Sequence, residues 1–226
     1  MENNETIRAI NNLDQRLRKI ENIFKPSGGS KNLDVLGDAK IKRINSTVRI
    51  KDVKLVYPTL TQKDIENSAN SPSTLVVIPN DNEVLNEIAK AYQSAYEYGI
   101  TSGKFNSNFS FDKLKSNTRE SVFVDGAKFI SEQKPDIQEF LKEVIGNGFL
   151  MRNVKVGVDQ NDNYNVVLRD SEGNLLGYDD KLSTGDVGEI VINFYPYNYK
   201  NKLGISRYIQ GFIVKETKAN FRSLFI

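Results

Sequence analysis

The chain has 226 residues, with 31 lysines and arginines against 29 aspartates and glutamates, and it contains no cysteine and no histidine. These absences exclude disulfides, thiol and imidazole catalysis, and almost every tetrahedral zinc site. The net charge of +2 does not by itself indicate a nucleic-acid binder. No apolar stretch is long enough to cross a membrane and the first residues lack a secretory signal, so we expect a cytoplasmic protein.

Residues 1–25 have the pattern of an amphipathic, coiled-coil-like helix, because apolar residues recur at alternating steps of three and four. This seam consists of Ile10, Leu13, Leu17, Ile20 and Phe24. A helix of this length needs packing to persist, so the seam predicts either oligomerisation through the helix or docking on its own domain. Residues 26–45 begin with Pro26, Gly28 and Gly29, and we expect them to form a flexible linker.

Residues 46–226 are predicted to form one main domain, which opens with strand patterns over 48–60 and 73–80. A helix over 81–98 should follow, with Asn80 as its cap and Glu83 reaching back. The Asp125-Gly126 pair predicts a tight turn between two short strands. A second helix is expected between Pro135 and Gly146.

Alternating apolar segments continue after residue 149, with turn residues at short spacing. Several strands in a row with one or two inserted helices favour an antiparallel barrel or sandwich over a parallel α/β fold. The predicted fold class is therefore β-rich α+β, an OB-like antiparallel β-barrel with inserted helices and an N-terminal helix.

The segment around residue 197 combines aromatic and basic residues. Tyr195, Tyr197 and Tyr199 are spaced by two, so on a strand they share one face, and Pro196 between them favours a strand edge or end. The basic and aromatic residues that follow are Lys200, Lys202, Arg207 and Tyr208. Single-stranded nucleic acid requires aromatic faces for bases and cations for phosphates. The alternative is that the tyrosines simply cover the core.

A second group is predicted to extend the same surface if the barrel brings it close. Its members are Lys54, Tyr57, Phe123 and Lys128. OB-fold ligands cross the central strands and their flanking loops, which makes this juxtaposition plausible. We expect no metal site and no cofactor.

Three stretches together resemble the OB-fold single-stranded DNA-binding proteins of tailed-phage replication modules: VRIKDVKLVYPTL, FVDGAKFISEQKPDI and GDVGEIVINFYPYNYKNKLGISRYIQGFIVKE. In that family a Gly-Asp pair precedes a strand ending in an aromatic-rich segment, and a glycine-containing loop leads to a last strand. The matching residues here are Gly185, Asp186, Asn193, Tyr195, Tyr197, Asn198, Gly204, Ile205 and Gly211.

The resemblance covers about residues 46–216 and implies a non-enzymatic protein that binds single-stranded DNA in replication or recombination, in the host cell cytoplasm if phage-encoded. Replication or recombination proteins would then be its protein partners. The chain ends in KANFRSLFI, whereas such proteins often end in an acidic tail that recruits them. Two other hypotheses remain: a structural or adaptor protein that oligomerises through its N-terminal helix, and a nuclease whose carboxylates hold metal.

Overall fold

The computed structural model describes residues 46–67, 71–116, 122–157, 165–200 and 202–217. The chain divides into two compact units, residues 1–37 and 38–226, and every described residue belongs to the second. The predicted N-terminal helix with its seam, and most of the predicted linker, lie outside the described residues.

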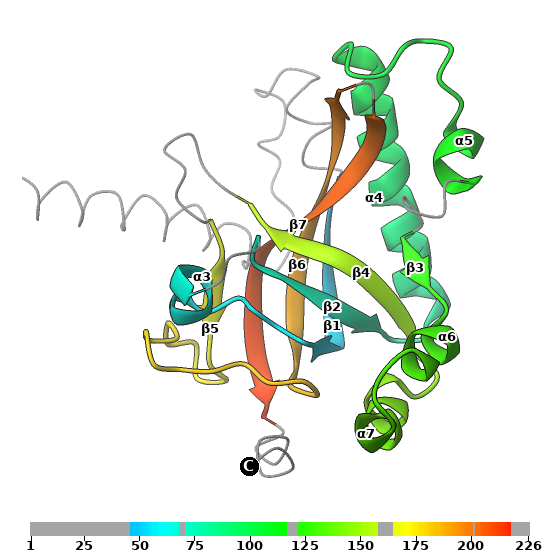
Figure 1. Cartoon of the computed structure of the whole chain (residues 1–226). Helices are drawn as coiled ribbons and strands as arrows, with labels where there is room; N and C mark the ends of the chain where they lie inside the picture. The colour runs from blue at the N-terminus through cyan, green and yellow to red at the C-terminus, as the bar shows by residue number, and fades with distance from the viewer. Residues whose placement is uncertain (1–45, 68–70, 117–121, 158–164, 201, 218–226) are drawn as a thin grey trace, which may run out of the picture. The chain divides into compact units, whose positions relative to one another are not determined.

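Seven strands form one sheet with both antiparallel and parallel pairings (Figure 1). The strands are β1 (Thr47–Val56), β2 (Ser73–Ile78), β3 (Phe123–Val124), β4 (Phe149–Val156), β5 (Val167–Arg169), β6 (Val187–Tyr199) and β7 (Lys202–Glu216). The helices are α3 (Gln62–Asn67), α4 (Asn82–Thr101), α5 (Phe111–Ser116), α6 (Gly126–Ser131) and α7 (Pro135–Ile145). The fold is therefore β-rich α+β, as the sequence predicts.

Five of these strands form a closed circuit of pairings, which we call the strand ring. β1 pairs with β2 and β6, β2 pairs with β4, and β6 pairs with β7, all antiparallel. β4 then pairs in parallel with β7 through Val154–Arg207, Lys155–Tyr208 and Val156–Ile209, and this contact closes the circuit. β5 also pairs in parallel with β7, so the prediction of a wholly antiparallel arrangement is wrong.

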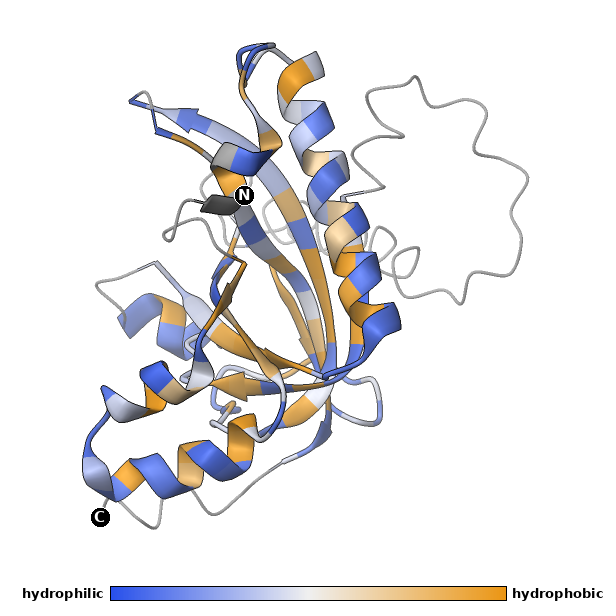
Figure 2. Cartoon of the chain, turned by 90° about the vertical axis from the view of Figure 1, so that its right-hand side faces the viewer, coloured by the Kyte–Doolittle hydropathy of each residue, from blue (hydrophilic) through white to orange (hydrophobic). Residues whose placement is uncertain are grey.

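The main core lies inside the strand ring and beneath α4. Ile88 and Tyr92 of α4 are buried, and the Tyr92 ring meets Phe194 of β6 edge-on, with ring centroids 5.7 Å apart. Figure 2 shows α4 running alongside the strands, with apolar residues recurring between polar ones. A second cluster joins α7 to β1, β2 and β4 through Leu141, Val144, Val56, Val77 and Leu150.

Two local predictions are wrong, because a short polar side chain suits a turn as well as a helix cap, and because neighbouring polar residues compete for the cap position. The Asp125-Gly126 pair does not join two strands. Asp125 instead caps α6, and its carboxylate accepts hydrogen bonds from the backbone N–H groups of Ala127 and Lys128. Helix α4 is capped by Asp81 rather than by Asn80.

The Asp81 cap gives a direct test of this helix start. Its carboxylate accepts hydrogen bonds from the backbone N–H groups of Glu83, at 2.7 Å, and Val84, at 3.2 Å. We expect Asp81→Ala to lower the free energy of unfolding by about 1 kcal/mol, the usual cost of losing a cap. Urea unfolding measures this, with Asn80→Ala as the matched control. An equal loss in the control would contradict the assignment.

Candidate nucleic-acid interface

The tyrosine row lies on β6 near its hairpin with β7. Phe194 and Pro196 are buried, whereas Tyr195 and Tyr197 are half-buried and Tyr199 is 64% exposed. Alternation along the strand therefore turns the tyrosines away from the core. Within the part of the chain that the structure describes, β1 pairs with β6 as far as Asn193, and Pro196 lies beyond that pairing. This explains how the strand tolerates a residue without an amide donor.

Tyr195 is held by the loop that follows α4. The Lys104 ammonium lies 2.9 Å from the Tyr195 hydroxyl and 4.2 Å from the centre of its ring. The amide of Asn198 donates a hydrogen bond to the Lys104 carbonyl at 3.2 Å. A cation that the sequence analysis did not single out is thus placed against the first tyrosine of the row.

Beside this tyrosine is a hollow of about 580 Å³, which we call the β4–β7 hollow. Its walls include Lys155, Asn193, Tyr195 and Tyr208. Lys155 is the direct partner of Tyr208 across β4 and β7, and Tyr208 is the partner of Asn193 across β7 and β6. Paired residues on neighbouring strands lie side by side on one face. Three strands therefore contribute one row of a cation, an aromatic ring and an amide.

A second hollow, of about 760 Å³, lies between α6, the strands β2, β3 and β4, and the segment that follows β1, and we call it the α6 hollow. It brings together three residues that the sequence analysis proposed, Tyr57, Phe123 and Lys128. Phe129 and Arg152 line it as well, and of these two only Arg152 was missed by the sequence analysis. Ser71 lines both hollows, so the two surfaces meet along the outer side of β4.

The charges favour an anionic ligand in the β4–β7 hollow more than in the α6 hollow. Among the described lining residues of the β4–β7 hollow, Lys155 is the only charged one. The α6 hollow carries Lys128 and Arg152 but also Asp125 and Glu132. The Asp125 carboxylate is engaged with the N–H groups of α6, which partly offsets its effect on the hollow.

Tyr57 forms one wall of the α6 hollow. Its ring centre lies 6.4 Å from that of Phe129, at an interplanar angle of 56°, and its hydroxyl is 3.4 Å from the Gln133 side-chain oxygen. Burial raises the pKa of the Tyr57 phenol above the ordinary value. Tyr57 is thus an aromatic side chain in a half-buried, partly wet setting, which suits base stacking.

Arg207, proposed as a phosphate contact, is placed elsewhere by the structure. It is only 3% exposed, and its guanidinium donates a hydrogen bond at 2.9 Å to the backbone carbonyl of Arg152. Its neighbours in register, Val154 and Phe194, are both fully buried. An arginine in the interior presents no charge to a strand on the surface, so the assignment of Arg207 as a surface contact is corrected.

Five other proposed residues line neither hollow, and one of them is Tyr197, which is half-buried on β6. The Lys54 ammonium donates to the Val144 carbonyl in the last turn of α7, at 3.0 Å. Tyr199, Lys200 and Lys202 lie at the end of the β6–β7 hairpin, where Lys200 is 5.2 Å from the centre of the Tyr199 ring. The structure does not bring these residues into the two hollows.

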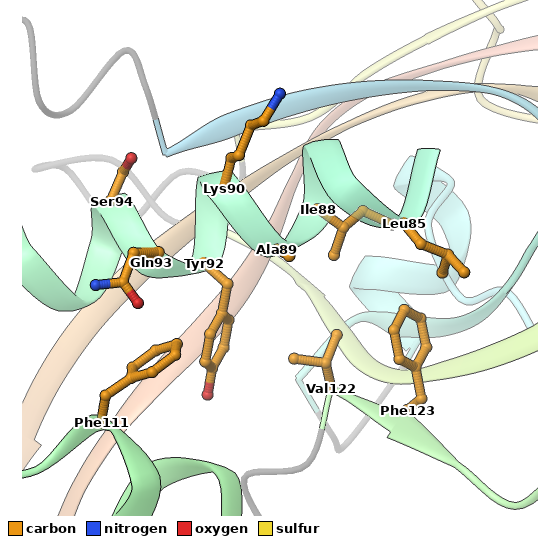
Figure 3. A pocket seen from close by; sticks show the side chains of 10 residues that line it. All are labelled: Leu85, Ile88, Ala89, Lys90, Tyr92, Gln93, Ser94, Phe111, Val122 and Phe123. Atoms are coloured by element: carbon orange, nitrogen blue, oxygen red, sulfur yellow. The ribbon is translucent and has the colours of Figure 1, made fainter. Parts of the chain in front are cut away.

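A third concavity has a different character. It measures about 640 Å³ and lies between α4, α5 and the start of β3 (Figure 3). Leu85, Ile88, Tyr92, Phe111 and Phe123 face it, and Lys90 is its only charged residue among the described lining. Phe123 lines both this apolar groove and the α6 hollow. Lys90 is paired with Glu87 at 2.8 Å, so the described lining of the groove offers little charge to a phosphate backbone.

Two searches of the described residues bear on other classes of protein. No helix in this part of the chain is long and apolar enough to span a membrane. Within the same residues, no group of three or more Asp, Glu, His or Cys side chains is gathered where it could hold a metal ion.

No family model matches the chain, and a search of curated proteins found no match. Several solved structures resemble it. The C-terminally truncated single-stranded DNA-binding protein of bacteriophage Enc34 gives a TM-score of 0.47 at 12% identity, over 78% of this chain and 87% of its own. The same Enc34 protein in complex with single-stranded DNA gives 0.45 at 13% identity, over 78% and 89%.

A third solved structure is gp2.5, a single-stranded DNA-binding protein encoded by bacteriophage T7. Its TM-score is 0.44 at 11% identity, over 76% of this chain and 86% of that protein. All three are structures of bacteriophage single-stranded DNA-binding proteins. Likenesses of this size leave the function of the chain to be argued from the residues of its own site.

The raised pKa of Tyr57 predicts a change in alkaline stability. Because the folded state favours the neutral phenol, this contribution is complete below the unfolded pKa and is lost as pH rises through the folded pKa. We expect the free energy of unfolding to fall more steeply above about pH 10 in the wild type than in Tyr57→Phe. Urea unfolding across that range measures it. Identical slopes would contradict the placement of this phenol.

Proposed function

We propose that the strand ring is an OB-like barrel and that the chain binds single-stranded DNA along the outer side of β4, without breaking bonds. The observation that carries this proposal is the cross-strand row formed by Lys155, Tyr208 and Asn193, with Tyr195 beside it. Ser71 joins that row to the second group of aromatic and basic side chains in the α6 hollow. One strand of DNA would follow β4 from one hollow to the other.

The chemistry of the two hollows matches the two parts of an unpaired nucleotide. Every base has an apolar face that stacks on an aromatic ring, which Tyr195 and Tyr208 supply in one hollow and Tyr57 in the other. Lys155 and Arg152, which lie on β4 itself, would follow the phosphates. Stacking and charge neutralisation tolerate any base, so we propose binding without sequence preference.

The biological role that fits this chemistry is protection of exposed single strands during phage DNA replication or recombination. A passive coat needs affinity over many sequences and no cleavage. If the chain were instead a carboxylate-metal nuclease, labelled oligonucleotide would be degraded once magnesium is added. We therefore expect mobility-shift gels in magnesium to show intact, retarded DNA.

Tyr208 gives the sharpest test of stacking, because it lies at the centre of the row. Loss of one stacked base costs roughly 1 to 3 kcal/mol, so we expect Tyr208→Ala to weaken oligo-dT binding at least several-fold. Tyr178→Ala is the matched control, since Tyr178 is 45% exposed and lines neither hollow. Fluorescence quenching on titration with oligo-dT measures both. Equal affinities in the two variants would move the site elsewhere.

Lys155 tests the electrostatic part of the site. Each phosphate neutralised on a single strand contributes about 0.7 to the slope of log affinity against log salt. Lys155→Ala should therefore lower the magnitude of that slope by about 0.7, with weaker binding at low salt. Lys142→Ala removes an exposed lysine from α7 and should leave the slope unchanged. Affinity that does not depend on salt in the wild type would argue against DNA binding.

A further inference from the structure

We infer that the α6 hollow is a preformed pocket for one unpaired base, and that the buried hydroxyl of Thr184 sets the position of Tyr57 as its stacking face. This inference rests on the proposed function and deepens it. It assigns a base subsite at one end of the proposed DNA path, and it makes Thr184 a positioning residue that does not itself contact DNA.

The backbone of Tyr57 is in an unusual conformation. Its φ is 50°, in the left-handed region that side chains other than glycine rarely adopt. Such residues persist only where the surrounding structure holds them, and they gather at ligand sites. Asn153, which lines the same hollow from β4, also has a positive φ, of 56°. Two left-handed residues therefore face one hollow from different strands.

The contact that holds Tyr57 comes from the loop before β6. The backbone N–H of Tyr57 donates a hydrogen bond to the hydroxyl oxygen of Thr184 at 3.0 Å, and Thr184 is only 2% exposed. The loop is hydrogen-bonded to β1 through both backbone groups of Leu55, its carbonyl and its N–H. Gly185 donates its N–H to the Leu55 carbonyl at 2.8 Å, and the Leu55 N–H donates to the Asp186 carbonyl at 3.0 Å.

The loop is also held by hydrogen bonds within itself. The carboxylate of Asp186, which is 1% exposed, accepts a hydrogen bond from the N–H of Ser183 at 2.7 Å. Gly185 has a φ of 96°, a conformation that glycine adopts without strain. The loop thus holds the Thr184 hydroxyl at a fixed place beneath the end of β1.

The direction that this backbone gives to the Tyr57 side chain completes the pocket. The ring stands against Phe129, its hydroxyl points to Gln133, and Lys128 and Arg152 lie on the same hollow for the flanking phosphates. An aromatic face that is already ordered loses little freedom when a base stacks on it. Removing the Thr184 hydroxyl should release Tyr57 and weaken DNA binding through Tyr57 alone.

A double-mutant cycle with oligo-dT tests this inference in the full chain. We expect Tyr57→Ala to weaken binding about tenfold or more, and Thr184→Val, which keeps the shape but removes the acceptor, to weaken it several-fold. Thr184→Ser restores the acceptor and should bind close to wild type. In the Tyr57→Ala background, Thr184→Val should cause no further loss. Thermal unfolding of each variant shows whether the fold is kept.

The inference would be overturned if Thr184→Val lowered the affinity for oligo-dT equally in the wild-type and the Tyr57→Ala backgrounds. It would also be overturned if Tyr57→Ala weakened binding while Thr184→Val did not. If Thr184→Val does not fold, hydrogen exchange at the wild-type Tyr57 amide tests whether that amide is hydrogen-bonded. A protected amide supports the contact with Thr184, and an amide that exchanges as fast as in an unfolded chain overturns it. Absence of oligo-dT binding by the wild type would instead defeat the proposed function.

Discussion

The parallel pairing of β4 with β7 is the contact on which the candidate site depends. It closes the strand ring, and its register settles which side chains share the outer face. Val154 and Val156 turn into the core, while Lys155 between them is exposed beside Tyr208. Because β6 pairs with β7 over its whole length, the same register places Asn193 next in the row. Without this pairing, the aromatic hairpin and the cations of β4 would lie on separate surfaces.

The positive φ of Tyr57 carries a cost in conformational free energy that the surrounding structure has to offset. A left-handed residue other than glycine costs of order 1 to 3 kcal/mol. The fold offsets that cost with the hydrogen bond that the Tyr57 N–H donates to the Thr184 hydroxyl oxygen, and with the loop that is hydrogen-bonded to Leu55. In the base pocket that we propose, this held ring would serve as the stacking face.

The sequence predicts those parts of the fold and site that depend on local pattern. The period of two along β6 places Tyr195 and Tyr197 on one face but leaves open whether that face covers the core, whereas the period of the helix identifies Ile88 and Tyr92 as buried. The interior place of Arg207 could not be read locally, because the pattern shows its alternation but not which face of β7 lies inward. Lys155 alternates with valines in β4, and this local pattern indicates that its side chain faces outward. Only the register of β4 with β7 shows that Lys155 lies beside Tyr208.

Photocrosslinking tests the central claim, that a single strand of DNA lies along β4, most directly. An oligo-dT in which iodouracil replaces thymine transfers covalently to aromatic side chains that stack on its bases. Peptide mapping should place the crosslinks at Tyr208 or Tyr195 in the β4–β7 hollow and at Tyr57 in the α6 hollow. Crosslinks confined to Tyr178, or to the exposed end of the hairpin at Tyr199, would contradict this account.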